Sequence, residues 1–159
     1  MRRPAISIPM RIALFEPEIA GNVGAILRLA ACMGTAVDLI EPMGFAWDDR
    51  RVRRAAMDYI DHVYVTRHAG FGDFSASVGP ARLVLFTTKA DASAYDFRFK
   101  QDDILLFGKE SAGVPQAVAD GCHERIRIPL RPQVRSLNVA TAAALALGEA
   151  LRQTDQLPG

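Results

Sequence analysis

Cysteine and histidine are scarce in this chain. Only two cysteines, Cys32 and Cys122, occur among 159 residues, which is too few for a disulfide framework. The three histidines, His62, His68 and His123, stand apart from one another, and none forms a cysteine–histidine cluster with zinc spacing. We therefore expect no metal centre and no histidine-activated nucleophile.

Long apolar runs and an excess of one charge are also missing. No stretch reaches the length of a membrane span, and no apolar segment of a secretory signal follows the N-terminal arginines. We therefore expect a cytoplasmic protein. Nineteen Lys and Arg balance 18 Asp and Glu, which gives a formal net charge of +1. Any binding of nucleic acid must then come from a local basic patch.

Half of the residues are hydrophobic, and the length is sufficient for one domain with a buried core. Short apolar runs alternate with segments of helical spacing. This order predicts one α/β domain over residues 1–159, with an ordered core from about 11 to 153. A mostly parallel sheet would be covered by helices on both faces. The apolar runs are residues 12–15, 37–40, 83–86, 104–107 and 126–128.

A first helix is expected after the first apolar run. Asn22 is a candidate N-cap, and Gly34 is a natural C-terminal stop. The side opposite the apolar stripe carries a single charge, Arg28, among small residues, as if a ligand or another chain approached it. The stripe consists of Ile26, Leu29, Ala30 and Met33.

The last helix, expected over residues 137–152, is apolar almost all the way round. Such a helix must be buried on all sides, which a small domain seldom achieves for a terminal helix. We therefore predict that it lies at the interface of a two-fold homodimer. A central helix within one subunit is the alternative.

Three blocks rich in Gly, Pro and small polar residues stand where a strand should end and a helix begin: residues 17–24, 106–115 and 126–138. Open α/β sheets build their ligand sites at such junctions, so the blocks predict one composite site. The first block lacks the GxGxxG pattern, and the second is no P-loop because Glu110 follows Lys109. In the third, Ser136 is a candidate helix cap.

A basic cluster, Arg50, Arg51, Arg53 and Arg54, follows two aspartates. On a helix, three of these arginines would share one face. A solvated helix surface is one explanation. Four arginines without a lysine favour contact with phosphate, because the guanidinium fork matches phosphate oxygens. These four are candidate phosphate-binding residues, and the resemblance described below makes RNA the expected partner.

Taken together, the blocks resemble the three signature motifs of the SPOUT superfamily of RNA methyltransferases. The resemblance covers residues 11–153 and is greatest to the single-domain tRNA (cytidine/uridine-34 2'-O)-methyltransferase family. Relatives often have Pro-Pro-Asn-Thr-Gly-Asn where residues 20–25 read Ala-Gly-Asn-Val-Gly-Ala, so Ala25 is given no role. Further support comes from residues 39–49, 58–59, 65–68, 87–89 and 149–153.

This resemblance implies a C-terminal deep trefoil knot and a homodimer with its site at the interface. It implies S-adenosylmethionine as methyl donor, S-adenosylhomocysteine as product, no metal, and the anticodon stem-loop of tRNA as partner. The donor contacts carried over by motif are Phe86, Thr87, Gly108, Ile128, Leu130, Ser136 and Leu137.

The implied reaction is methylation of the ribose 2'-hydroxyl of the wobble nucleotide, a cytidine or modified uridine. A 2'-O-methyltransferase for another tRNA position or for rRNA, and a non-catalytic RNA-binding dimer, are the alternatives. The catalytic candidates carried over by motif are Arg28, Asn22, Glu110, Ser136 and Asn138.

Overall fold

One six-stranded sheet organises the molecule, as the computed structural model of residues 9–159 shows. The strand order is β3-β2-β1-β5-β4-β6, and all neighbouring strands are parallel, which confirms the predicted class. The strands are β1 (Arg11–Phe15), β2 (Ala36–Ile40), β3 (Val65–His68), β4 (Leu83–Phe86), β5 (Ile104–Phe107) and β6 (Glu124–Ile126). The helices are α1 (Ala20–Met33), α2 (Asp49–Ala55), α3 (Phe71–Ser77), α4 (Gln116–Asp120) and α5 (Val139–Gln153), with a 3-10 turn η1 (Tyr59–His62).

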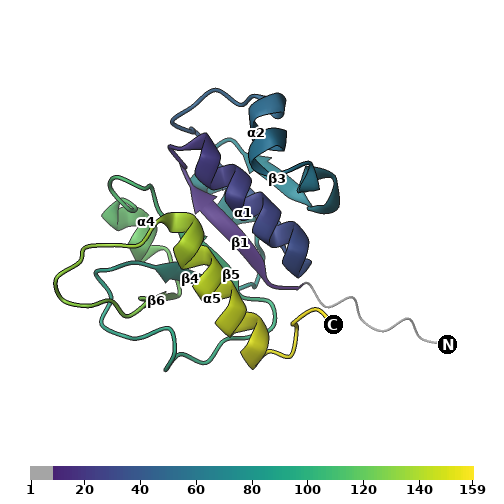
Figure 1. Ribbon diagram of the computed structural model, residues 1–159. Helices are drawn as coiled ribbons and strands as arrows, with labels where there is room; N and C mark the ends of the chain where they lie inside the picture. The colour runs from purple at the N-terminus through teal and green to yellow at the C-terminus, as the bar shows by residue number, and fades with distance from the viewer. Residues whose placement is uncertain (1–8) are drawn as a thin grey trace.

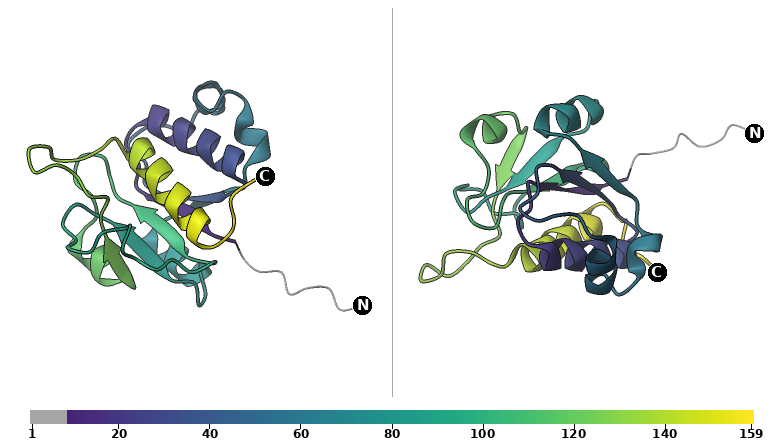
Figure 2. Two further views of the ribbon diagram at one scale, coloured as in Figure 1. Left: turned by 60° about the horizontal axis from the view of Figure 1, so that its bottom comes forward. Right: turned by 90° about the horizontal axis from the view of Figure 1, so that it is seen from above.

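Helices cover both faces of the sheet (Figures 1 and 2). α1, α2 and α5 lie on one face, and α3 and α4 lie on the other. Side chains alternate between the faces along each strand. In β1, Ile12 and Leu14 pack with the α1–α5 layer, whereas Ala13 and Phe15 pack with the α3–α4 layer. Strands buried on both faces explain why the central runs are apolar throughout.

The edge strand β3 does not follow an apolar run, and the sequence analysis did not identify it as a strand. Two of its four residues are exposed, because β3 has a neighbour on one side only. His68 in β3 contacts the buried Asp38 of β2 through a 2.7 Å hydrogen bond, and Arg11 of β1 lies 3.3 Å from the same carboxylate. This polar pairing across three strands replaces the apolar pattern there.

α1 begins earlier than predicted. Its first residue is Ala20 and its N-cap position is Ile19, which has no capping side chain. Asn22 is therefore inside the first turn and is not the cap; its side-chain oxygen accepts a hydrogen bond from Asn138 instead. The predicted stop is confirmed: Gly34 ends the helix in the left-handed conformation, with φ of 69°.

One of the small residues near Arg28 is explained by packing within the chain. Gly24 is buried at the contact of α1 with α2, where a Cβ would overlap the Cβ of Ala55. We expect Gly24→Ala to lower stability by about 1–3 kcal/mol, the usual cost of overpacking. Thermal unfolding of the variant measures this.

The matched control is Gly148→Ala in α5, where no atom lies within 4 Å of an added Cβ. There the better helix propensity of alanine should raise stability by about 0.5–1 kcal/mol. Equal unfolding temperatures for the two variants would contradict the close α1–α2 packing.

α5 is capped by Asn138, not by Ser136. The Asn138 side chain accepts hydrogen bonds from the backbone N–H groups of Ala140 and Thr141, and Ser136 lies outside the helix. One face of α5 is buried within the protomer. The other face leaves Ala144 and Leu145 exposed, with Leu145 42% accessible, so the protomer alone does not bury this helix on all sides.

The connection between β4 and β5, residues 87–103, lies against two later parts of the chain. Arg127, just after β6, pairs with it through its N–H to the carbonyl of Ala92 (2.9 Å) and its carbonyl to the N–H of Ala94 (2.8 Å). The Gln153 amide at the end of α5 accepts from the N–H of Phe99 and donates to the carbonyl of Phe97. This connection therefore joins the exit of β6 to the last helix.

Between residues 9 and 159, no helix is both long and apolar enough to cross a membrane. The same residues contain no group of three or more His, Cys, Asp or Glu that could hold a metal ion. Of the cysteines, Cys32 is exposed and Cys122 is buried, and burial raises the pKa of the Cys122 thiol to about 11. Cys122 is therefore protonated at neutral pH and a poor nucleophile.

Candidate functional site

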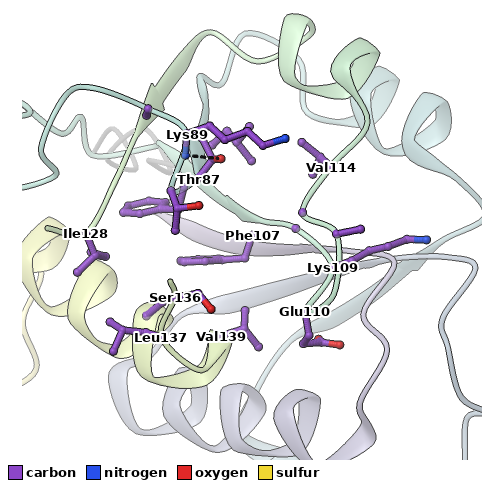
Figure 3. Close-up of a pocket in the computed structure, with 18 of the residues that line it drawn as sticks. Thr87, Lys89, Phe107, Lys109, Glu110, Val114, Ile128, Ser136, Leu137 and Val139 are labelled. Atoms are coloured by element: carbon purple, nitrogen blue, oxygen red, sulfur yellow. Dashed lines mark hydrogen bonds between the residues drawn. The ribbon is translucent and has the colours of Figure 1, made fainter. Parts of the chain in front are cut away.

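A pocket of about 1190 Å³ opens at the carboxyl edge of the sheet (Figure 3). It lies beside the crevice between β1 and β5, where the strand order changes direction, as expected for an open α/β sheet. All three sequence blocks contribute to its lining, together with the residues that follow β4. The structure thus brings into one cavity segments that are far apart in the sequence.

Most residues singled out from the sequence lie in this lining. The exceptions are Arg28 and the four arginines of α2, which lie elsewhere on the surface. The lining also includes residues to which no role was assigned, among them Ile19, Lys89 and Val114. The predicted residues present are Asn22, Phe86, Thr87, Gly108, Glu110, Ile128, Leu130, Ser136, Leu137 and Asn138.

One wall of the pocket is apolar and built from aromatic rings at strand ends. Phe86 and Phe107 stack with centroids 4.9 Å apart and an interplanar angle of 14°. Ile128, Leu137 and Val139 border the same hollow, and Lys109 and Glu110 lie on its opposite side (Figure 3). Such a surface suits a flat, partly apolar ligand.

The loop after β5 forms a tight cradle. The N–H and carbonyl of Lys109 pair with the carbonyl and N–H of Gly113 at 2.8 and 3.0 Å. A Cβ on Gly108 would lie 2.5 Å from the carbonyl carbon of Gly113, and Gly113 has φ of 65°. The close contact therefore requires glycine at position 108, and the left-handed backbone favours glycine at position 113, so the backbone can close on itself at the pocket wall.

Three hydrogen bonds tie this loop to the segment after β1. The Glu18 carboxylate accepts from the N–H (2.9 Å) and hydroxyl (2.7 Å) of Ser111. In return, the N–H of Glu18 donates to the Glu110 carboxylate at 2.7 Å. Lys109 adds an ion pair with Glu16 at 3.3 Å. We call Glu18, Glu110 and Ser111 the carboxylate latch.

The two carboxylates of the latch differ in acidity. Hydrogen bonds from the side chain and backbone of Ser111 hold the pKa of Glu18 below its ordinary value. Burial raises the pKa of Glu110, although the N–H of Glu18 opposes this effect. As the pH falls, Glu110 is neutralised first. Ionised Glu18 therefore stabilises the folded state at pH values above its unfolded-state pKa. This stabilisation is lost as the pH falls through the lower pKa of Glu18 in the folded state.

The sequence analysis gave Glu18 no role, since only the fold places it beside residues 92 and 93 positions later. If the pocket binds S-adenosylhomocysteine, as the sequence resemblance implies, we expect Glu18→Ala to loosen the cradle and to weaken this binding about tenfold, as measured by isothermal titration calorimetry. The expected loss follows from removing a charge-assisted hydrogen bond.

Glu18→Gln is the matched control, because its amide oxygen still accepts from Ser111, and it should lose less affinity than Glu18→Ala. Equal affinities for wild type and Glu18→Ala would refute a positioning role for the latch.

The N-termini of α1 and α5 meet at the pocket through a side-chain contact. The Asn138 amide nitrogen donates to the Asn22 oxygen at 3.0 Å, while the Asn138 oxygen caps α5. Ser136 is exposed, and its hydroxyl has no hydrogen-bond partner among residues 9–159. Polar groups of the first and third blocks therefore face one space.

Arg28 is not brought to this pocket within the protomer. It is exposed on α1, six residues beyond Asn22, or about 9 Å further along the helix axis. Its guanidinium lies 5.7 Å from the centre of the Tyr59 ring. Any contact of Arg28 with a ligand in the pocket would need a second copy of the chain or a bound substrate that spans the gap.

The four arginines of α2 are all exposed. Asp48 caps this helix by accepting from the N–H of Arg50 at 2.9 Å. Arg53 is held by Asp61 through contacts of 3.1 Å, which raise the pKa of Arg53. Arg50, Arg51 and Arg54 have no ion-pair partner within the described part of the chain.

Comparison with known proteins assigns the chain to a family. The model of the SpoU rRNA Methylase family matches residues 9–148. The chain belongs to this family. A protein of Beijerinckia indica named tRNA (cytidine(34)-2'-O)-methyltransferase is 54% identical over 149 residues, which cover 92% of each chain. A protein of the same name from Escherichia coli K12 is 42% identical over 91% of this chain and 93% of its own length.

Solved structures of the family share the architecture. One, from work on the 2-OH methylation of C/U34 on tRNA, has a TM-score of 0.87 and 38% identity, covering 92% of this chain and 97% of its own. The SpoU methyltransferase AviRb from Streptomyces viridochromogenes, in complex with the cofactor AdoMet, has a TM-score of 0.85 and 28% identity, covering 94% of this chain and 59% of its own.

Proposed function

We propose that this protein transfers a methyl group from S-adenosylmethionine to the ribose 2'-hydroxyl of the wobble nucleotide of tRNA. The observation that carries the proposal is the single pocket formed by the three motif blocks. The relatives named for this activity match the chain over nearly its whole length. A tRNA-modifying enzyme of this kind would act in the cytoplasm.

The pocket fits the proposed donor. The stacked rings of Phe86 and Phe107 offer a flat apolar surface, and the Gly108 cradle leaves no room for a side chain where backbone approaches the cavity. Ser136 offers a hydroxyl at the pocket surface. When bound, S-adenosylmethionine supplies an electrophilic methyl group on a sulfonium.

The protein must then orient the 2'-oxygen and stabilise it as it becomes nucleophilic. A bound donor would supply the methyl group and keep the electron pair of the broken carbon–sulfur bond on its sulfur, and the hydroxyl proton would leave to solvent or a nearby base. Asn22 and Asn138 would hold the ribose, and the guanidinium of Arg28 would stabilise the developing alkoxide. Glu110 positions the cradle through the latch.

We also propose that the protein works as a homodimer that brings the Arg28 of one subunit to the pocket of the other. The exposed small and apolar residues on α1 and α5, which pack side by side, support this arrangement. Leu145→Glu places a charge on that surface and should yield monomers in sedimentation velocity, with loss of methylation. A wild-type protein that sediments as a monomer at micromolar concentration would refute the dimer.

The C-terminal part is proposed to be threaded as a trefoil knot. The contacts of residues 87–103 with Arg127 and with Gln153 support a passage of the final segment beside this connection. Pulling the chain by its two ends in a single-molecule experiment tests the knot, and a chain that straightens fully would exclude it.

The activity is tested by incubating the protein with radiolabelled S-adenosylmethionine and unmodified tRNA, followed by nuclease digestion and mass spectrometry of the nucleosides. We expect one 2'-O-methylated nucleoside, at the wobble position. The control is the same tRNA with a 2'-deoxy nucleotide there, which should accept no methyl group. Methylation of that control, or of another position or an rRNA fragment instead, would overturn the proposal.

RNA contact by α2 predicts a strong dependence on salt. If Arg50, Arg51 and Arg54 bind phosphates, each should add about 0.7–0.9 to the slope of log affinity against log salt concentration. The variant with all three changed to alanine should therefore show a slope lower by about 2–3, as measured by filter binding of tRNA. An unchanged slope would remove α2 from the RNA-binding surface.

A further inference from the structure

A second, smaller depression adjoins the main pocket. It has a volume of about 140 Å³ and shares Thr88, Ile128, Leu130 and Arg135 with the main pocket. Its other lining residues include Arg127 and Arg131. We call the surface formed by Arg127, Arg131 and Arg135 the arginine depression. It is separate from the α2 arginines, none of which lines either cavity.

The charge of the arginine depression is not compensated within the protein. All three arginines are exposed, and none has an ion pair or side-chain hydrogen bond among residues 9–159. In contrast, Arg82 is paired with the buried Asp103 through contacts of 2.7 and 2.9 Å. Asp91 and Glu110, the acidic residues that line the main pocket, do not line the depression.

The backbone holds these arginines together. The backbone N–H and carbonyl of Arg127 form hydrogen bonds with Ala92 and Ala94, respectively. These bonds fix the position of Arg127 beside the connection after β4. A turn closed by the N–H of Val134 and the carbonyl of Arg131, at 3.2 Å, brings the chain from Arg131 back towards Arg135. The charges therefore converge on a defined place instead of spreading along an extended segment.

We propose that the arginine depression binds a phosphodiester of the RNA substrate, next to the nucleotide whose ribose enters the main pocket. This inference rests on the proposed function. Guanidinium groups bind phosphate oxygens through paired hydrogen bonds, and the shared wall of Ile128 and Leu130 places such a phosphate at the pocket mouth. Binding the single carboxylate of S-adenosylmethionine would require one positive charge, whereas the depression has three unpaired ones.

The test compares wild type with a variant in which Arg127, Arg131 and Arg135 are changed to alanine. We expect tRNA affinity and kcat/KM for tRNA to fall tenfold or more, with a slope against salt lower by about 2–3. Affinity for S-adenosylhomocysteine, measured by calorimetry, should change less than about twofold. Arg98→Ala, an exposed arginine outside both cavities, is the matched control and should retain tRNA affinity.

The outcomes separate this inference from the proposed function. If wild type binds no S-adenosylhomocysteine and methylates no RNA, the proposed function fails. If wild type is active but the triple alanine variant keeps its tRNA affinity and salt slope, the phosphodiester subsite is refuted. Loss of S-adenosylhomocysteine affinity with unchanged tRNA affinity would also refute it, because the arginines would then serve the donor. A triple lysine variant, which retains charge, should recover the slope even if the alanine variant folds poorly.

Discussion

Arg28→Ala is expected to reduce the methylation rate by about 10²–10³-fold, the usual cost of removing a group that stabilises developing charge. Affinity for S-adenosylhomocysteine should stay nearly unchanged, because Arg28 is proposed to act on the ribose oxygen and not on the donor. Single-turnover methylation and calorimetry measure the two quantities. The contact with Tyr59 is exposed, so its loss should cost no more than about 1 kcal/mol of stability. Parallel loss of rate and donor affinity would contradict the assigned role.

A mixing experiment tests whether Arg28 acts across the subunit interface. Arg28→Ala supplies an intact pocket, and a pocket-defective variant supplies an intact Arg28. If the two variants exchange subunits at random, half of the dimers are mixed. One of the two sites in each mixed dimer then has both an intact pocket and an intact Arg28, so the activity per subunit should recover to about one quarter of the wild-type value. No recovery after verified exchange would place Arg28 in the same subunit as its pocket.

Gly108→Ala is expected to abolish most donor binding and provides that pocket-defective partner. The added Cβ would lie 2.5 Å from backbone atoms of Gly113, which cannot move aside as a flexible side chain would. The two hydrogen bonds between Lys109 and Gly113 must then stretch or break. If the loop opens to relieve a strain of about 1–3 kcal/mol, affinity for S-adenosylhomocysteine should fall about 5- to 150-fold.

Gly70→Ala is the control for this change. Gly70 also lies in a loop next to the sheet, but its φ of −172° suits any residue, and no atom lies within 4 Å of an added Cβ. Its donor affinity should equal that of wild type. Unchanged affinity in Gly108→Ala, measured with the same preparation of S-adenosylhomocysteine, would show that the cradle does not shape the binding site.

The central strands could be predicted from the sequence because a parallel sheet covered on both faces requires unbroken apolar segments. β1, β2, β4 and β5 are buried along nearly their whole length and appear as such runs. β3 could not be found in this way, since its position depends on pairing with β2 and its stability includes the contact of His68 with Asp38. The sequence of an edge strand therefore shows a weaker apolar pattern than that of a central strand.

The helix caps show the limit of local reasoning. Asn22, Ser136 and Asn138 are all good capping residues by type. Asn138 caps a helix, whereas Asn22 contacts Asn138 from within the first turn of α1 and Ser136 faces the pocket. The choice among them depends on where two helices separated by more than 100 residues meet, which no local pattern contains.

The three blocks could be recognised because they coincide with strand ends, and parallel strands end at one edge of the sheet. The individual pocket residues followed from the resemblance of these blocks to family motifs. Glu18 was missed for the opposite reason. Its carboxylate acts on Ser111 through a contact between distant loops. Arg28 lies away from these residues, so one protomer does not assemble the whole predicted catalytic set.

The Gln153 side chain links the C-terminal end of α5 to the connection between β4 and β5, which forms part of the pocket wall. Its amide joins the backbone at Phe97 and Phe99 to a helix whose first residues border the cavity. Fraying of the last helical turn should therefore release part of the connection that forms the pocket wall. Amide hydrogens of Phe99 and of the final turn are expected to exchange with deuterium at matching rates, as one cooperative unit.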